Sequence, residues 1–426
     1  MSKSYNVVSG DTLGDIAVKY YGSFSKWVLI RDANPQLLGR KKAPGGSPLI
    51  YPGDVLVIPF ENSDAPKING EAPLVLNDAA PGDFSILIDG KSFTGFSGAE
   101  LSFSLDSFDT FAFSAPFDDS VFSQKAAFMP YTYKSCAVYL DKELLFSGRL
   151  LTPNPEVSPA SRSVALQGYP HCGVLNDCTL PDTKYPPEYS GKKLDEIAKD
   201  ALAPFGLKVV TETDTGSPFN EVGCDIEKTI LSFLVDLAKQ RGVLVTNTAQ
   251  GDLLLWKAKN KKPVAVFKEG EYPLISCAAN FDAQKMYSHI TGYTKTKNEK
   301  MSEKYTYVYR YLANKGILRP HSFVIDDAEE TDLKNSVLSY AGRMFADAVS
   351  YTLSVAGHGD SFGNIYKKNT IVSVLAPGSM IFRETLFLVK TVRITRDNLD
   401  SDVTTLEVVL PGSYSGEIPE VMPWEE

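Results

Sequence analysis

The spacing of apolar and polar positions changes along the chain, and the first 60 residues form one unit. "YNVV" alternates like a short strand, and Thr12 can cap a helix whose apolar positions follow the spacing of one buried face. These positions are Leu13, Ile16, Ala17 and Tyr20. A second helix near 26–33 and a closing strand in "YPGDVLVIP" complete the unit. The pattern predicts a small βααβ domain over residues 1–60.

A linker and a β-rich region follow this unit. Residues 61–82 are rich in Pro, Ala, Asn, Asp and Gly, which is typical of a semi-extended linker. From Phe84 the apolar period changes to two, and "FSILIDGKSF" carries Asp89-Gly90, a strong hairpin signal. Two more hairpins are expected in "LSFSLDSFDTFAFSAP" and "CAVYLDKELLFSGRL". We therefore predict a tube-like antiparallel β-barrel domain over 83–170.

The helical period returns between two β regions. "KKLDEIAKDALAPFG" and "DIEKTILSFLVDLAKQRG" each place apolar residues on one helix face, and "VLVTNTAQGDLLLWKA" is typical of a hairpin. These elements predict an α+β insert over 171–271. Period-two segments resume over 272–415 around one helix, which predicts a second tube-like β domain, and an extended acidic tail is expected over 416–426. The predicted fold class is mainly β with an α+β insert.

The two β regions contain one similar pair of segments. "LSFSLDSFDTFAFSAPF" and "VRITRDNLDSDVTTLEVVLPGSY" share a plan of strand, polar Asp-bearing loop, strand and proline. A duplicated domain would produce this likeness, but so would the ordinary resemblance between any two hairpins. The residues alone favour the second interpretation.

Composition narrows the class of protein. The chain has 426 residues and a net charge of −9, so the basic surface expected of a duplex-DNA binder is missing. It contains no apolar run long enough to predict a transmembrane helix, and "MSKSYNVV" lacks the apolar region of a secretory signal. The five cysteines are odd in number and scattered, which favours reduced thiols in a protein made in a cytoplasm.

The sequence offers no constellation for catalysis or metal binding. The four histidines are far apart, and none belongs to a His-Glu-x-x-His motif. His171, Cys172 and Cys178 are close in sequence, but no second ligand pair follows at zinc-site spacing. We predict a protein that is not an enzyme and that binds no cofactor or metal.

The first unit resembles a LysM domain in the order strand, "SGDTL", helix, "DANPQL" and "YPGDVLVIP". In that family a sugar-binding groove lies between the first strand–helix turn and the loop after the second helix. The matching positions are Gly10, Asp11, Thr12, Asn34 and Pro35. The same residue types also supply the turns and caps that any LysM fold needs, so both interpretations stay open.

The order of elements over 83–415 resembles the baseplate hub proteins of contractile phage tails, in the Mu-like and late-control-D group. "FSILIDGKSFTGF", "GKKLDEIAKDALAPFGLKVV" and "YTLSVAGHGDSFGNIYKKNTIVSVLAPG" carry the resemblance. The most telling segment is "DIEKTILSFLVDLAKQRGVLVTNTAQGDLLLWKA". The fused LysM unit departs from the pattern of that family, and we interpret it as an assembly clip.

This resemblance implies a homotrimer in the virion tail, assembled in the host cytoplasm. Two β domains per chain would give six similar units around a ring, matching a hexameric tail tube above and a spike below, beside neighbouring wedge proteins. An acidic lumen would let DNA pass without specific binding.

Two alternatives from other classes are kept. The first is a LysM-targeted protein that binds peptidoglycan or degrades the cell wall. The second is the hub of a phage-tail-like injection particle, such as a bacteriocin.

Overall fold

The structure is a computed structural model. It describes residues 2–21, 27–37, 40–41, 48–59, 84–93, 96, 98–117, 126–140, 143–158, 162–258, 262–295, 301–325, 330–359, 364–396, 402–419 and 421–425. The chain forms two compact units, residues 1–74 and 75–426. The linker predicted over 61–82 lies outside the described residues.

The N-terminal unit is the predicted βααβ domain. β1 (Ser2–Asn6) runs antiparallel to β2 (Val55–Pro59), with Tyr5 opposite Leu56. Between them lie α1 (Leu13–Tyr21), α2 (Trp27–Asp32) and a 3-10 turn (Pro35–Leu37). The core contains Val7, Leu13, Ile16, Ala17, Ile30, Leu37, Leu56 and Ile58. This core confirms the apolar face predicted for α1.

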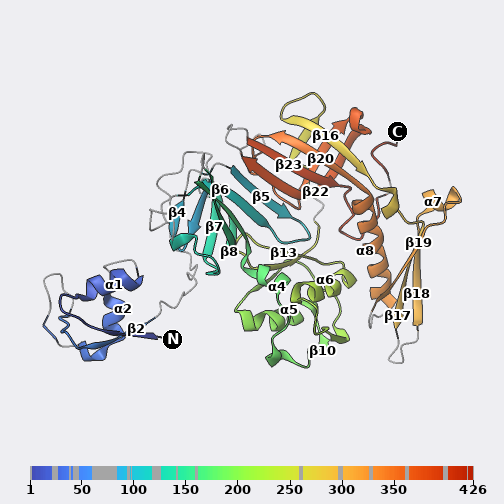
Figure 1. Cartoon of the computed structure of the whole chain (residues 1–426). Coiled ribbons are helices and arrows are strands. Elements are labelled where there is room, and N and C mark those ends of the chain that lie inside the picture. The colour runs from blue at the N-terminus through green and yellow to red at the C-terminus, as the bar shows by residue number, and fades with distance from the viewer. Residues whose placement is uncertain are drawn as a thin grey trace. The chain divides into compact units, whose positions relative to one another are not determined.

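The second unit is built on a large, mostly antiparallel sheet that both β regions share (Figure 1). The strands of the first region are β3 (Phe84–Ile88), β4 (Lys91–Phe93), β5 (Gly98–Ser104), β6 (Thr110–Pro116), β7 (Ser135–Leu140), β8 (Glu143–Val157) and β9 (Arg162–Pro170). The strands of the second region in this sheet are β15 (Ala265–Lys268), β16 (Leu274–Phe281), β20 (Val349–Ala356), β21 (Ile371–Ala376), β22 (Ile381–Arg396) and β23 (Asp402–Val409).

The insert forms a separate α+β lobe beneath this sheet (Figure 1). It contains α4 (Val174–Asp177), β10 (Glu188–Lys192), α5 (Leu194–Leu202), β11 (Val209–Thr211), β12 (Phe219–Gly223), α6 (Ile230–Gln240), β13 (Leu244–Asn247) and β14 (Leu253–Trp256). β13 and β14 form the predicted hairpin, and the left-handed Gly206 ends the turn after α5. Thr229 caps α6, where its hydroxyl accepts the Ser232 N–H (3.3 Å).

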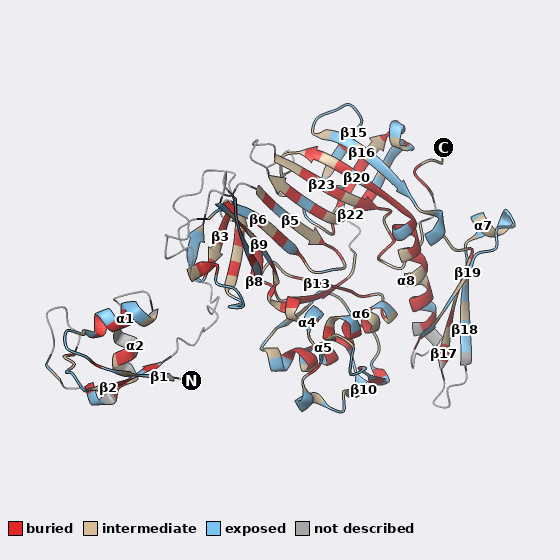
Figure 2. Ribbon diagram, in the orientation of Figure 1, coloured by how far each residue is buried: buried red, intermediate tan, exposed pale blue. Residues whose placement is uncertain are grey.

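Between β16 and β20 along the chain, the sequence forms a small sheet and two helices. The sheet contains β17 (His289–Lys295), β18 (Met301–Val308) and β19 (Pro320–Ile325), with α7 (Arg310–Asn314) between β18 and β19. α8 (Glu330–Ala348) follows, and its apolar face packs into the main core. Buried positions alternate along the strands that face this core (Figure 2).

The two β regions repeat one strand plan. Four strands of the first lie in the order β5-β6-β9-β8, and four of the second in the order β16-β20-β23-β22. All neighbours are antiparallel, and β8 and β22 are both long strands that begin in a hairpin with β7 or β21. β22 also pairs with β5, so the two sets join into one layer. The counterpart of hairpin β5–β6 is therefore β16–β20, and the sequence comparison with β22–β23 matched elements that are not equivalent.

Two other expectations are corrected. β15, which the sequence analysis assigned to the insert, pairs in parallel with β21 in the large sheet. A four-residue strand without a hairpin partner carries little sequence signal. The C-terminal tail packs on the sheet and is not a free extended segment. Met422 is buried, the Phe382 N–H donates to the Pro423 carbonyl (3.3 Å), and the Trp424 ring meets Phe281 edge-on.

Candidate functional site

The turn residues predicted for a LysM groove are engaged in their own fold. The Asp11 carboxylate accepts hydrogen bonds from the Tyr5 hydroxyl and the Val8 N–H, both at 2.9 Å. The exposed Thr12 caps α1, because its hydroxyl accepts the Asp15 N–H (3.1 Å) and donates to the Asp15 carboxylate (2.6 Å). Gly10 has φ +95°, a conformation that favours glycine.

The Asn34 side chain connects α2 to β2 through hydrogen bonds. Its side chain is fully buried, and its amide nitrogen donates to the Ile30 carbonyl (2.6 Å) and the Val57 carbonyl (2.7 Å). Its amide oxygen accepts from the Val57 N–H (2.8 Å) and the Gln36 amide (2.9 Å). Asn34 thus ties the end of α2 to β2, and Pro35 begins the 3-10 turn beside it. Among the described residues, no hydrogen bond joins these two to Gly10, Asp11 or Thr12.

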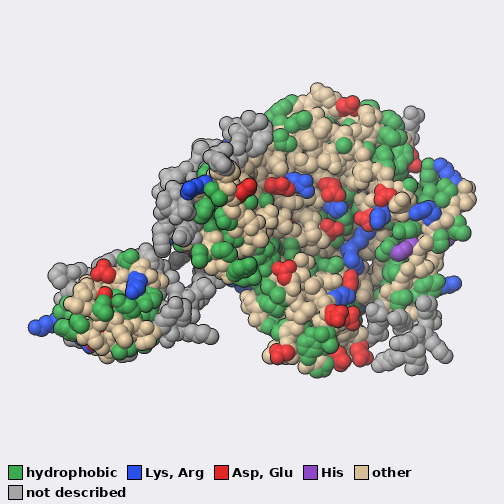
Figure 3. Space-filling model, in the orientation of Figure 1, with side chains coloured by type: hydrophobic (Ala, Val, Ile, Leu, Met, Phe, Trp, Pro, Cys, Tyr) green, Lys and Arg blue, Asp and Glu red, His purple; other side chains and the backbone are tan. Residues whose placement is uncertain are grey.

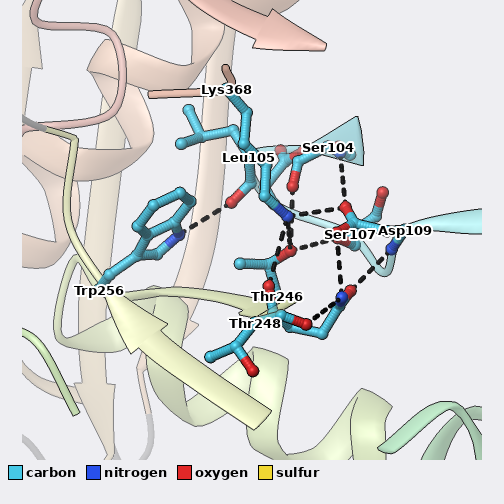
Figure 4. A network of polar contacts seen from close by, with 10 residues as sticks. Ser104, Leu105, Ser107, Asp109, Thr246, Thr248, Trp256 and Lys368 are labelled. Carbon is cyan, nitrogen blue, oxygen red and sulfur yellow. Dashed lines mark hydrogen bonds and ion pairs between the residues drawn. The ribbon is translucent and has the colours of Figure 1, made fainter. Parts of the chain in front are cut away.

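A buried polar network joins the three parts of the second unit (Figure 4). Asp109 comes from the β5–β6 turn, Asn247 from β13 of the insert, and Lys368 from the segment before β21. The Asp109 carboxylate accepts from the Lys368 ammonium (2.7 Å), the Asn247 amide (2.9 Å) and the Ser104 N–H (3.0 Å). The Asp109 N–H donates to the Asn247 amide oxygen (2.8 Å). The first β region, the insert and the second β region therefore each supply one residue of this network.

Burial and charge pairing have opposite effects on the pKa of Asp109. Asp109 is 2% exposed, and its burial raises the pKa of the carboxyl group. The nearby Lys368 and the donors from Ser104 and Asn247 favour the charged form and counter this effect. The Lys368 ammonium also donates to the Thr246 hydroxyl (2.9 Å), which in turn donates to the Ser107 carbonyl (2.6 Å). The chain thus holds a buried ion pair whose hydrogen-bonding groups have partners.

Apolar contacts reinforce the same junction. The Trp256 indole N–H donates to the Leu105 carbonyl (3.0 Å), as Figure 4 shows. The surrounding cluster draws on the first β region, the insert and the second β region: Leu105, Leu244, Leu254, Trp256, Ala346, Ile371, Leu388, Val409 and Tyr414. The three parts of the second unit are therefore packed together, and the junction can hold the two β regions at a fixed angle.

A second feature is the close approach of the insert to β8. The Gly251 carbonyl accepts from the Cys172 N–H (3.0 Å), and a Cβ on Gly251 would lie 2.4 Å from the Ser147 carbonyl oxygen. The half-buried His171 lies beside them, with its Nε2 3.2 Å from the Ser147 hydroxyl. Burial, and to a lesser degree the Arg149 charge, lower the pKa of His171.

The remaining candidates are the cysteines and one cleft. All five cysteines are free, and burial raises the pKa of the Cys136 thiol to about 12. Cys172 is fully buried, and no group of His, Cys, Asp and Glu among the described residues could hold a metal. A cleft of about 870 Å³ lies between α6, α8 and the small sheet, and acidic and basic side chains gather near it (Figure 3). The described residues that line it include no histidine or cysteine.

None of the helices that the structure describes is long and apolar enough to cross a membrane.

Comparisons with known proteins identify two domains. Residues 5–59 match the model of the LysM domain, and residues 172–257 match that of "Baseplate hub protein gp44-like, second domain". The baseplate hub protein gp44 of Escherichia phage Mu is 24% identical over 133 residues, covering 29% of this chain and 33% of that protein. The match thus spans about a third of the length of the curated relative.

Two solved structures share the fold of the second unit. The 43 kDa tail protein of prophage MuSo2 from Shewanella oneidensis is 21% identical, with a TM-score of 0.64, covering 79% of this chain and 100% of that one. A tail protein from Neisseria meningitidis is 17% identical, with a TM-score of 0.66, covering 79% and 99%.

These matches relate the chain to phage tail proteins: residues 172–257 fit the gp44-like hub domain, and the second unit shares the fold of two tail proteins. More narrowly, they confirm its resemblance to Mu-like baseplate hub proteins and its LysM domain. The sequence analysis missed the Asp109 network, because Asp109, Asn247 and Lys368 are single polar residues in segments far apart along the chain.

Proposed function

We propose that the protein is a structural component of a contractile phage tail baseplate. Three copies form a hub ring that joins the six-fold tail tube to the central spike. The observation that carries this proposal is the repeated four-strand set in each chain. Three chains would present six similar units, and this duplication resolves the mismatch between a trimer and a hexameric partner.

The buried junction supports the same role. A ring that transmits force between tube and spike needs its β units held at a fixed angle. The Asp109–Lys368 pair and the cluster around Trp256 provide that rigidity without exposing a reactive group. The net charge of −9 suits a lumen through which DNA passes, because like charges repel.

The LysM domain acts as an assembly clip that contacts a neighbouring tail protein, with no wall-cleaving role. The side chains of Asp11, Thr12 and Asn34 form hydrogen bonds within the domain, which supports this assignment over sugar binding. The exposed Val55 and Val57 of β2 offer an apolar face of the kind that protein partners cover.

A mass measurement in solution tests the hub assignment. Native mass spectrometry or sedimentation at assembly concentrations is expected to find a trimer. A stable monomer or a two-fold dimer under all conditions would refute the ring.

Deleting residues 1–60 tests the clip. The truncated protein is expected to fold and form the ring, but to fail in co-assembly with tube and baseplate subunits. Normal co-assembly, together with a loss of peptidoglycan binding, would instead favour the sugar-binding alternative.

A further inference from the structure

The segment that leads into β7 is exposed and mostly apolar. Residues 129–133, the tyrosine loop, have the sequence Met-Pro-Tyr-Thr-Tyr, and all five are exposed. Met129 is 50% exposed, Tyr131 88% and Tyr133 55%. Single apolar residues scattered over a surface are normal, whereas a contiguous exposed group of them is typical of an interaction site. The composition of this loop therefore favours a surface that a partner covers.

Both tyrosines of the loop hold a strained backbone conformation. Tyr131 has φ +59° and Tyr133 has φ +48°, in the left-handed region that large side chains rarely adopt. Within the described part of the chain, no other aromatic residue has a positive φ. Strain of this kind lowers stability, and it is concentrated at binding and catalytic sites in proteins. The two tyrosines thus hold positions that folding alone does not favour.

Hydrogen bonds keep the loop in this conformation. The Thr132 hydroxyl donates to the Met129 carbonyl (2.7 Å), which closes the loop on itself. The Arg149 guanidinium, from β8, donates to the Tyr133 carbonyl (3.2 Å). These two bonds hold the backbone on either side of Tyr131, so the exposed ring projects from a fixed base.

Both ends of the loop are anchored in the first β region. Before the loop, Phe128 is buried, and its ring contacts those of Phe93 and Phe117, with centroids 5.6 Å and 6.0 Å away. After the loop, the Lys134 carbonyl accepts the Leu150 N–H (2.9 Å). Because the loop is already ordered, a partner that binds it loses little conformational entropy.

The two tyrosine side chains make no contribution to this anchoring. Among the described residues, no hydrogen bond, ion pair or ring contact involves the side chain of Tyr131 or Tyr133. Each ring offers a large apolar area with few rotatable bonds, and each hydroxyl can donate or accept a hydrogen bond. Tyrosine and arginine are enriched among the residues that contribute most to the affinity of protein interfaces. Tyr131, Tyr133 and the adjacent Arg149 form such a group.

The charges around the loop favour an acidic partner. Residues 126–140 contain one lysine and no acidic residue, although the whole chain carries a net charge of −9. Lys134 pairs with Asp89 (3.2 Å), and the exposed Lys91 follows the same turn. The half-buried Arg149 makes no ion pair with a carboxylate of the described residues. A carboxylate from a partner would therefore complete the environment of Arg149.

The polar groups of the loop favour a protein over a glycan. Aromatic rings can stack on sugars, but the specific binding of a polar ligand also needs a few well-placed polar groups. Residues 126–140 contain no Asp, Asn, Glu or Gln. The Thr132 hydroxyl donates within the loop, and Met129 and Pro130 add apolar surface.

We propose that the tyrosine loop is the docking site for a neighbouring protein of the same tail, which covers Tyr131 and Tyr133 with an apolar recess and places a carboxylate near Arg149. This inference rests on the structural role in the tail proposed above and names one contact surface for it. A second copy of this chain and a glycan are the competing occupants, and the experiments below distinguish them.

A photoreactive residue identifies the occupant. Replacing Tyr131 by p-benzoylphenylalanine keeps an aromatic ring at this position, and irradiation of the assembled tail is expected to link it to a different tail protein. The same replacement of Tyr311, which is 47% exposed on α7, is the control and is expected not to link to that protein. Links to another copy of this chain, equal linking from both positions, or no link at all would overturn the proposal.

Two substitutions separate the ring from the backbone strain. Tyr131→Asn removes the ring, and asparagine adopts positive φ more readily than tyrosine. The free protein is therefore expected to unfold at the same or a higher temperature, while its co-assembly with the other tail proteins falls roughly tenfold or more. Tyr131→Phe keeps both the ring and the strain and is expected to co-assemble like the wild type.

The outcomes separate this inference from the hub assignment. Tyr131→Asn is expected to form the same ring as the wild type in native mass spectrometry, and loss of that ring would place the loop between copies and overturn the docking proposal. Normal co-assembly of Tyr131→Asn also overturns it and leaves the hub standing. Peptidoglycan binding that is lost in Tyr131→Asn would show that the loop binds a glycan instead. A wild type that never forms a ring refutes the hub assignment, whatever the loop contacts.

Discussion

Lys368 donates a 2.7 Å hydrogen bond to Asp109, although 259 residues separate them along the chain. The side chains are 13% and 3% exposed, so this ion pair is shielded from water. The adjacent Lys367 makes a comparable contact with Glu143 (2.8 Å), but those side chains are 62% and 45% exposed. Two neighbouring lysines thus form ion pairs of very different environment.

This contrast gives the first prediction. Lys368→Met leaves the Asp109 carboxylate buried without its cation and is expected to destabilise the protein by about 3–5 kcal/mol. Lys367→Met removes an exposed pair and is expected to cost about 0–1 kcal/mol. Denaturant unfolding of both variants checks the difference. Equal losses for the two lysines would show that the Asp109 network does not hold the junction together.

A second prediction concerns pH. Burial lowers the pKa of His171 below its usual value near 6.5, so the folded protein holds this ring neutral where the unfolded chain protonates it. The unfolded state therefore binds more protons below about pH 6.5, and stability falls as the pH drops through that value. Burial lowers the pKa of His358 as well, against the opposing effect of Asp402.

His171→Gln tests this assignment, because glutamine keeps a polar group near Ser147 but does not titrate. Urea unfolding midpoints at pH 7.5 and pH 5.5 are expected to differ less for the variant than for the wild type. An unchanged difference would mean that His171 does not contribute to the pH dependence.

The third prediction concerns the LysM domain. Asn34→Ala removes a fully buried amide and leaves the Val57 N–H and two carbonyls without this partner, at about 1–3 kcal/mol for each unsatisfied group. The small N-terminal unit is expected to unfold while residues 75–426 stay folded. Limited proteolysis should therefore release the N-terminal unit and leave the larger one intact. Gln36→Ala, at an exposed position whose amide donates to the Asn34 amide oxygen (2.9 Å) and the Val55 carbonyl (3.5 Å), leaves the Asn34–Val57 bonds in place, so it is the control and should resist cleavage.

Local features of the fold could be predicted from the sequence. The apolar positions of α5 and α6 are buried, including the fully buried Leu234, and Asp89-Gly90 forms the turn between β3 and β4 with both residues at positive φ. Helix periodicity and turn chemistry act within a few residues, so one segment contains the whole signal.

Long-range pairing could not be predicted in the same way. Nothing in the sequence of β5 specifies that it pairs with β22 instead of another open strand, because any antiparallel strand satisfies its backbone. Likewise, Asp109 and Asn247 are ordinary turn and strand-end residues until the fold brings them together. For the LysM groove, residue types alone could not separate binding from capping, since Asn34 suits both.

The last prediction compares two glycines of the same backbone conformation. Gly251 and Gly270 have φ of +84° and +80°, so alanine at either position adopts a strained left-handed conformation, at about 1 kcal/mol. Around Gly270 a Cβ meets nothing within 4 Å, whereas at Gly251 it lies 2.4 Å from the Ser147 carbonyl and 2.8 Å from the His171 nitrogen. Both of those atoms belong to the backbone, so neither can rotate away.

Gly251→Ala is therefore expected to push the insert away from β8. It should lower the stability of the protein clearly more than Gly270→Ala does. Thermal unfolding measures the difference in stability. Hydrogen exchange at the Cys172 amide, which donates to the Gly251 carbonyl within the insert, reports local loosening around Gly251 and is expected to rise in Gly251→Ala alone. If both variants lost the same stability with no change at Cys172, backbone strain would account for the whole effect, and the close packing of the insert on β8 would not contribute to the stability of residues 75–426.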